Sequence, residues 1–141
     1  MVLSTSDITN IISVLKTFPA IELVYLFGSQ LTSEATSESD VDLAIKLQPQ
    51  SEVKIIRQVS NILNQSLPHT FDCRLISDQS DPIFLHQSVW LGQCLYATNQ
   101  LSRIKFEVFV EQLYLDDESR QQIIAQYLPQ YFQSNKGNYA Y

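Results

Sequence analysis

The sequence predicts a single α/β (α+β) domain, on three observations. Short runs of branched and aromatic residues alternate with longer stretches in which apolar residues recur every three or four positions. The 141 residues suffice for one buried core but not for two. Apolar residues make up 45% of the chain and charged residues 17%, a balance typical of a folded protein rather than of a disordered one.

The N-terminal part predicts a helix followed by a strand. A serine at position 4 or 6 can cap the start of an amphipathic helix, which Pro19 ends. Residues 21–27 are rich in branched and aromatic side chains and too short for a helix, so we expect a strand there, in the centre of the sheet. Residues 30–39 are polar and predict a loop or a short helical turn.

The next segment predicts a strand, a helix and a second strand. Residues 40–47 alternate between polar and apolar side chains, so that all the large apolar ones share one face of a strand. The stripe of apolar residues at 55–63 predicts a helix that ends before Pro68. Residues 71–76 predict a further strand with Asp72 and Arg74 on one face.

The C-terminal part reads as mostly helical. We expect a short helix at 81–91, an edge strand at 94–96, and helices from Leu101 onward with a break at Asp116-Asp117. The domain core then spans about residues 3–115. Residues 116–141 form a helical C-terminal region and an aromatic tail, which we expect to dock on the body or on a partner.

Charge and composition exclude several classes of function. The net charge of −6 is the wrong sign for a protein that holds a long nucleic acid by its phosphates. The apolar runs are too short to span a membrane, and the N-terminus lacks a signal-peptide pattern, so we expect a cytoplasmic protein. Cys73 and Cys94 form no CxxC pair, and we expect both to be free.

Two aspartates at the start of a predicted strand indicate a metal site. Asp40 and Asp42 lie two residues apart, so their carboxylates point to one side with Cα atoms roughly 6 to 7 Å apart. Such a pair repels unless a cation intervenes, and magnesium prefers oxygen ligands. Asp72 can complete the site from the equivalent face of a neighbouring strand. Gly28 and Ser29, directly after the preceding strand, can form a phosphate cradle, because glycine lets the backbone approach closely.

These motifs resemble the nucleotidyltransferase superfamily of DNA polymerase beta type. The resemblance rests on a Gly-Ser pair, ten further residues, Asp-x-Asp, and a third aspartate on a later strand. More narrowly, the small size, the stretch from Phe27-Gly28-Ser29 to Ser39-Asp40-Val41-Asp42-Leu43, and Gly92-Gln93-Cys94-Leu95-Tyr96 resemble minimal nucleotidyltransferase (MNT) proteins. These are MntA-like antitoxins that pair with HEPN-domain toxins.

The resemblance implies a mixed β-sheet flanked by helices, two Mg2+ ions as cofactor, and ATP as nucleotide donor. It further implies transfer of AMP to a tyrosine of a cognate HEPN ribonuclease toxin, which neutralises the toxin in a hetero-oligomeric complex. Matched by position, Gly28 and Ser29 bind the triphosphate, and Asp40 and Asp42 bind metal. Asp72 is the third carboxylate, which binds the catalytic metal and helps to deprotonate the attacking hydroxyl.

Two alternatives remain at this point. The same chemistry can act on a small molecule such as an aminoglycoside, whose positive charge suits an acidic protein. An antitoxin can also act by occlusion alone, without catalysis. The second alternative draws on Leu31 and Ser33, which stand where the family often has a small residue and a glycine.

Overall fold

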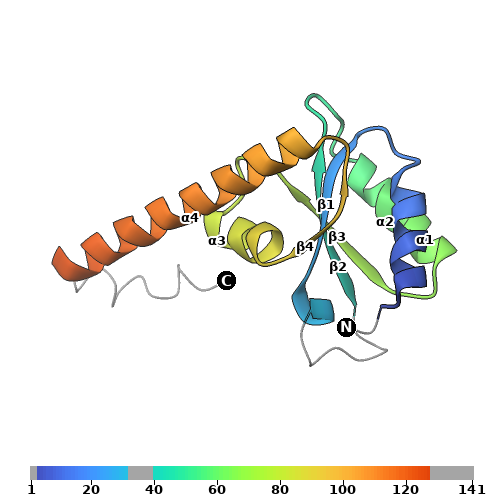
Figure 1. Ribbon diagram of the computed structural model, residues 1–141, viewed down its shortest axis with the longest axis horizontal. Helices are drawn as coiled ribbons and strands as arrows, with labels where there is room; N and C mark the ends of the chain where they lie inside the picture. The colour runs from blue at the N-terminus through green and yellow to red at the C-terminus, as the bar shows by residue number, and fades with distance from the viewer. Residues whose placement is uncertain (1–2, 32–39, 128–141) are drawn as a thin grey trace.

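A computed structural model of the chain describes residues 3–31 and 40–127 (Figure 1). The elements are, in order, α1 (Thr5–Leu15), β1 (Ile21–Phe27), the 3-10 helix η1 (Gly28–Leu31), β2 (Val41–Leu47), α2 (Ile55–Ser66), β3 (Phe71–Ile76), α3 (Pro82–Leu85), the π-helical turn η2 (His86–Trp90), β4 (Gln93–Ala97) and α4 (Gln100–Tyr127). The strands at 21–27 and 71–76 have the predicted bounds. The predicted short helix at 81–91 is divided into α3 and η2.

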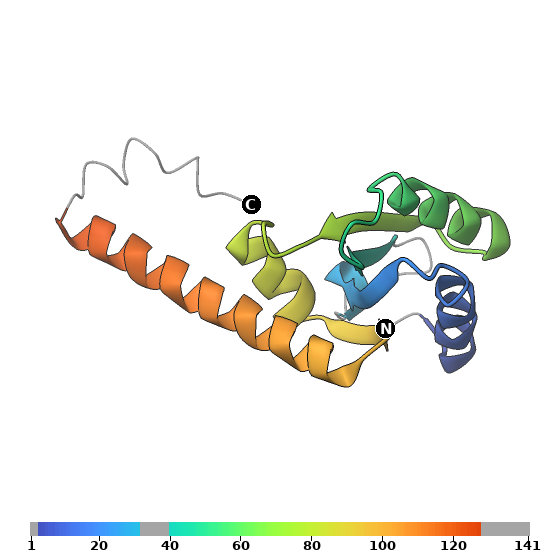
Figure 2. The same ribbon diagram turned by 90° about the horizontal axis from the view of Figure 1, so that it is seen from above.

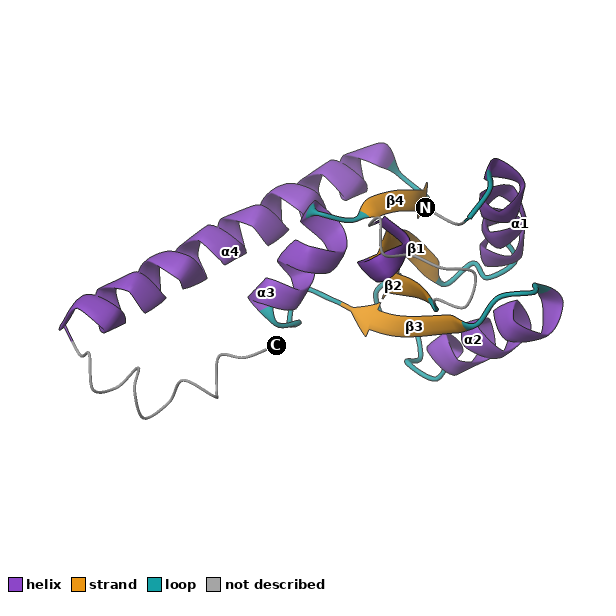
Figure 3. Cartoon of the chain, turned by 90° about the horizontal axis from the view of Figure 1, so that it is seen from below, coloured by secondary structure: helices purple, strands orange, loops and turns teal. Residues whose placement is uncertain are grey.

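The four strands form a mixed sheet in the order β3-β2-β1-β4. β1 is antiparallel to both β2 and β4, whereas β2 and β3 are parallel. The predictions that the first strand is central and that the strand at 94–96 is an edge are therefore confirmed. In Figure 3 the strands lie between α4 and α3 on one side and α1 and α2 on the other.

Capping explains where the first helix begins. The Ser4 hydroxyl accepts a hydrogen bond from the Asp7 backbone N–H at 3.0 Å, and the Asp7 carboxylate accepts one from the Ser4 N–H at 2.9 Å. This reciprocal capping box satisfies two backbone donors at the helix start. Ser4, rather than Ser6, is thus the cap.

The alternation along β2 separates two cores, one on each face of the sheet. Val41, Leu43 and Ile45 are buried against α1 and α2. Ala44, on the opposite face, is buried in a second cluster with residues of α3, η2 and α4. The face that carries the polar residues of β2 is therefore covered over its middle by helices, and only the ends of the strand leave room for polar side chains.

The predicted helix break at Asp116-Asp117 is wrong, because α4 continues through both residues to Tyr127. Aspartate disfavours a helix interior when its carboxylate competes for backbone donors. Here the Asp117 carboxylate instead accepts hydrogen bonds from Arg120 Nη2 at 2.6 Å and Gln121 Nε2 at 2.9 Å, one turn further along. These contacts stabilise the helix across the acidic pair. The expected aromatic tail lies outside the described residues.

Two further expectations concern the chain as a whole. Cys73 and Cys94 are both free and partly buried. None of the helices in the described part is long and apolar enough to cross a membrane. α4 extends well beyond the sheet, so that its C-terminal half leaves the body of the molecule (Figure 2).

Candidate nucleotide-binding site

The topology brings the motif residues to one end of the sheet. β1 ends at Phe27, which pairs with Asp42 at the beginning of the antiparallel β2. Asp42 in turn pairs with Asp72 near the start of the parallel β3. The end of β1 therefore meets the starts of β2 and β3. As a result, Gly28, Asp42 and Asp72 are neighbours in space, although Gly28 and Asp72 are 44 positions apart in the sequence.

Gly28 is required by both its backbone conformation and its surroundings. Its φ of 80° lies in the left-handed region, which side chains with a Cβ adopt only at a cost. A Cβ at this position would collide with a carboxylate oxygen of Asp42 and stand 3.3 Å from its Cγ. The missing side chain therefore leaves the space that the Asp42 carboxylate occupies.

Ser29 follows Gly28 within η1. The loop or short helical turn predicted for residues 30–39 is a helical turn at Gln30 and Leu31, the part of it that the structure describes. Ser33, the other position noted for its departure from the family pattern, lies outside the described residues.

Asp42 lies in surroundings that favour its protonated form. Burial raises the pKa of Asp42 above its usual value, and the negative charges of Asp72 and Asp40 raise it further, against an opposing contribution from Arg74. Asp40 immediately precedes β2 and is exposed. An excess of negative charge in one small region is thus the electrostatic signature of this end of the sheet, and a divalent cation relieves it.

We tested whether these residues fit the magnesium ions that the family implies. The donor set suits magnesium, since it consists of carboxylate oxygens, and the absence of a side chain at Gly28 makes room for the one on Asp42. No three His, Cys, Asp or Glu side chains converge as a ready metal cage anywhere in residues 3–31 and 40–127. Asp72 Oδ2 instead lies 3.4 Å from Arg74 Nε. The carboxylates are neighbours of the right chemistry for magnesium, but in the described residues they do not form a preorganised coordination site.

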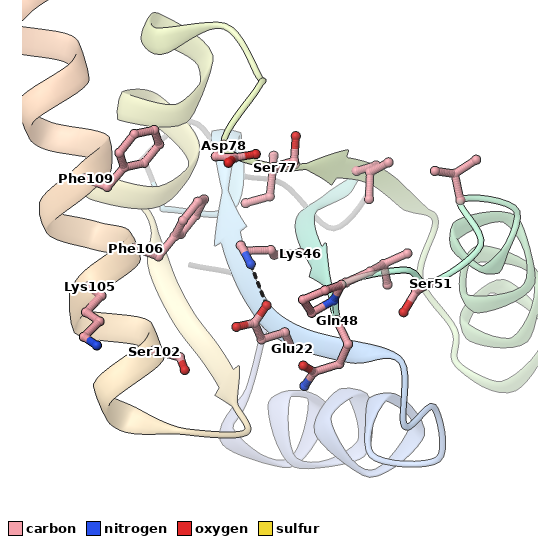
Figure 4. Close-up of a pocket in the computed structure, with 15 residues that line it drawn as sticks. Glu22, Lys46, Gln48, Ser51, Ser77, Asp78, Ser102, Lys105, Phe106 and Phe109 are labelled. Atoms are coloured by element: carbon pink, nitrogen blue, oxygen red, sulfur yellow. Dashed lines mark hydrogen bonds and ion pairs between the residues drawn. The ribbon is translucent and has the colours of Figure 1, made fainter.

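The two basic residues on the carboxylate faces of β2 and β3, Lys46 and Arg74, both form ion pairs. Lys46 Nζ lies 2.5 Å from Glu22 Oε2, and it also stands 5.3 Å from the centre of the Phe106 ring. This pair lines a cavity of about 680 Å³ at the opposite end of β2 from the aspartates (Figure 4). The sequence contains no signal for this cavity, because it forms only where the end of β2 meets α4.

Comparison with known proteins assigns the family. A model described as "Polymerase beta, Nucleotidyltransferase" matches residues 9–101, which include Gly28, Ser29 and all three aspartates. The chain belongs to this family. No curated protein matches the sequence.

Several solved structures share the fold of this nucleotidyltransferase. A toxin-antitoxin structure with AMP-PNP superposes with a TM-score of 0.70 at 23% identity, covering 85% of this chain and 96% of the other. A tri-AMPylated HEPN toxin in complex with MNT antitoxin, from Shewanella oneidensis, gives 0.64 at 22% identity, with 84% and 92% covered. A mutant of the toxin-antitoxin MntA-HpeT gives 0.66 at 25% identity, with 84% and 94% covered. The predicted fold, a mixed sheet flanked by helices, is confirmed, as is the likeness to MNT antitoxins.

Proposed function

We propose that this nucleotidyltransferase uses Mg-ATP to transfer AMP to a tyrosine of a HEPN-domain toxin, and thereby acts as the toxin's antitoxin. The observation that carries the proposal is the meeting of Gly28, Asp42 and Asp72 at one end of the sheet. Support also comes from the likeness to the MNT antitoxin found with a tri-AMPylated HEPN toxin.

In this proposal the residues around Gly28 bind the nucleotide. Gly28 lets the Asp42 carboxylate stand against the turn that holds the triphosphate, and Ser29 follows in that turn with its hydroxyl and backbone N–H. Asp40, Asp42 and Asp72 hold the magnesium ions. When bound, the ions neutralise phosphate charge, which explains how a chain of net charge −6 accepts a polyanionic ligand.

The transfer step exchanges the phosphoanhydride bond between the α- and β-phosphates of ATP for a phosphoester bond to tyrosine. The tyrosine oxygen attacks the α-phosphorus, a new oxygen–phosphorus bond forms, and the bond from the α-phosphorus to the bridging oxygen breaks so that pyrophosphate leaves. In this proposal the phenolic proton passes to the carboxylate of Asp72, near the start of β3. Holding donor and acceptor in line is the main contribution of the protein to such a step.

An exposed apolar face on α4 favours a protein as the acceptor rather than a small molecule. Four apolar side chains at helical spacing point away from the body and are about half exposed: Leu101 (60%), Ile104 (54%), Val108 (53%) and Leu115 (51%). No other described segment covers them. Contiguous exposed apolar surface of this kind is typical of protein interaction sites.

The test is intact-mass spectrometry of a purified HEPN partner after incubation with this protein, magnesium and ATP. We expect a mass gain of one or more AMP units with the parent protein and none with the Asp40→Asn, Asp42→Asn double variant. A stable complex without mass gain would contradict catalysis and favour occlusion. Absence of both a complex and a mass gain would direct the search to small-molecule acceptors.

A further inference from the structure

β3 is an edge strand of the sheet, and no described segment lies along its outer side. Figures 2 and 3 show β3 at the rim, with β2 on its inner side and α2 packed against one face. An edge strand presents backbone groups that can pair with another chain. The question is which of these groups are open.

The hydrogen bonds of the neighbouring residues identify the open groups. The Val41 N–H donates to the Thr70 carbonyl at 2.8 Å, so residue 70 points toward β2. In a parallel pair, alternate residues direct both backbone groups to the same side. Residues 70, 72, 74 and 76 therefore face β2, and residues 71, 73 and 75 face outward.

Asn64 of α2 closes the first outward position. The Phe71 N–H donates to Asn64 Oδ1 at 2.9 Å, and Asn64 Nδ2 donates to the Phe71 carbonyl at 3.4 Å. Cys73 and Leu75 have no such partner for their outward backbone groups within residues 3–31 and 40–127. Two N–H groups and two carbonyls thus remain open in a row.

A groove of about 660 Å³ runs beside these open groups, between β3 and α2. Cys73 and Leu75 form its strand side, and residues of α2 and the preceding turn form its other side: Val53, Lys54, Ile56, Arg57, Ser60 and Asn61. Lys54 is paired with Glu52 at 2.9 Å. Arg57 is exposed and makes no ion pair with any described residue, so the groove offers one uncompensated positive charge.

We propose that this groove binds an extended acidic peptide of a partner protein, which adds to β3 as a fifth strand. The open groups of Cys73 and Leu75 pair with the peptide backbone. One apolar side chain of the peptide enters the groove, and a neighbouring carboxylate faces Arg57. Main-chain pairing supplies affinity in this mode of recognition, and the flanking pocket supplies specificity.

The charges and the backbone together select this occupant. A helix has no free backbone donors and acceptors to offer along its side, so it cannot satisfy the open edge. A second copy of this chain paired through β3 would bring two Arg57 side chains to the same junction. The proposal concerns binding alone, and it stands whether or not the aspartates transfer a nucleotide.

The test begins with a library of short random peptides displayed on phage and selected on the parent protein. We expect enriched peptides to combine alternating β-branched residues with a carboxylate. Synthetic copies of the enriched peptides should slow hydrogen exchange at the Cys73 and Leu75 amides by about tenfold or more, as measured by NMR. The amides of Asp72 and Arg74 should change little, because they already pair with β2.

Three variants at exposed helical positions complete the test without disturbing the core. Arg57→Glu reverses the groove charge and should weaken binding by about tenfold or more. Asn61→Trp fills the groove and should abolish binding. Arg120→Glu makes the same charge change on α4. It removes the ion pair with Asp117, so circular dichroism first checks that the variant is folded, and its binding should then be unchanged. Failure to enrich peptides, or equal affinity for all three variants, would overturn the proposal.

Discussion

Gly28→Ala tests whether the absence of a side chain at position 28 is what makes room for the Asp42 carboxylate. The substitution acts in two ways that the structure separates. Alanine must adopt a φ of 80°, and its Cβ must occupy space that a carboxylate oxygen of Asp42 now fills. The first effect depends on the backbone alone, whereas the second depends on the side chain at position 42.

The two contributions differ enough to be measured. A left-handed conformation costs a residue with a Cβ about 1–2 kcal/mol. Inserting a methyl group into occupied space costs a further 1–3 kcal/mol or so. We therefore expect Gly28→Ala to lower the free energy of unfolding by about 2–5 kcal/mol in the parent protein, but by only about 1–2 kcal/mol when Asp42 is already alanine.

The assay is urea unfolding followed by circular dichroism, carried out as a double-mutant cycle in metal-free buffer. Asp42→Asn is the matched control, because an amide has the size of the carboxylate and should keep the full cost of Gly28→Ala. A coupling energy of about 1 kcal/mol or more is expected between Gly28→Ala and Asp42→Ala. An equal cost of Gly28→Ala in all three backgrounds would refute the steric argument.

Three further predictions address charge, the strand edge and thiol chemistry. Because burial and the nearby carboxylates raise the pKa of Asp42, its contribution to stability is complete below the ordinary carboxyl pKa of about 4 and is lost as pH rises through the raised value. Urea unfolding in metal-free buffer should show Asp42→Asn gaining stability over the parent across this range, and parallel pH profiles would contradict it. Asn64→Leu should cost about 1–2 kcal/mol in the same assay, because it removes the side-chain partner of the Phe71 backbone; a neutral result would show that water replaces it fully. Burial raises the pKa of the Cys73 thiol to about 11, so iodoacetamide at pH 8 should alkylate it about a hundredfold more slowly than in the urea-unfolded chain, as peptide mass spectrometry can measure. Equal rates would mean that the thiol is accessible and ionised.

Much of the fold follows from local sequence. Strand alternation at 40–47 assigned the faces of β2 correctly, because a period of two leaves one choice once the apolar face is buried. The Ser4 cap similarly fixes the start of α1 through backbone chemistry that involves only near neighbours, whereas the helix ends at Leu15, four residues before the Pro19 that was predicted to end it. The length of α4 was not predicted correctly. The helix continues through Asp117 because of side-chain hydrogen bonds to residues one turn away, rather than because of intrinsic helix propensity.

The candidate site divides in the same way between local and non-local information. The expectation that Asp40 and Asp42 share a face is local, because it follows from the period of two along a strand, but β2 begins at Val41 and leaves Asp40 just before the strand. Asp42 lies opposite Asp72 because of the register between β2 and β3, which no spacing in the sequence encodes. The steric clash between a Cβ at Gly28 and the Asp42 carboxylate likewise depends on the register between β1 and β2. The open backbone at Cys73 and Leu75 is further removed from sequence, because it depends on which side of β3 remains unpaired and on the reach of Asn64. Motifs thus indicate which residues carry chemistry, while the sheet determines what they face, and binding surfaces made of backbone leave no motif.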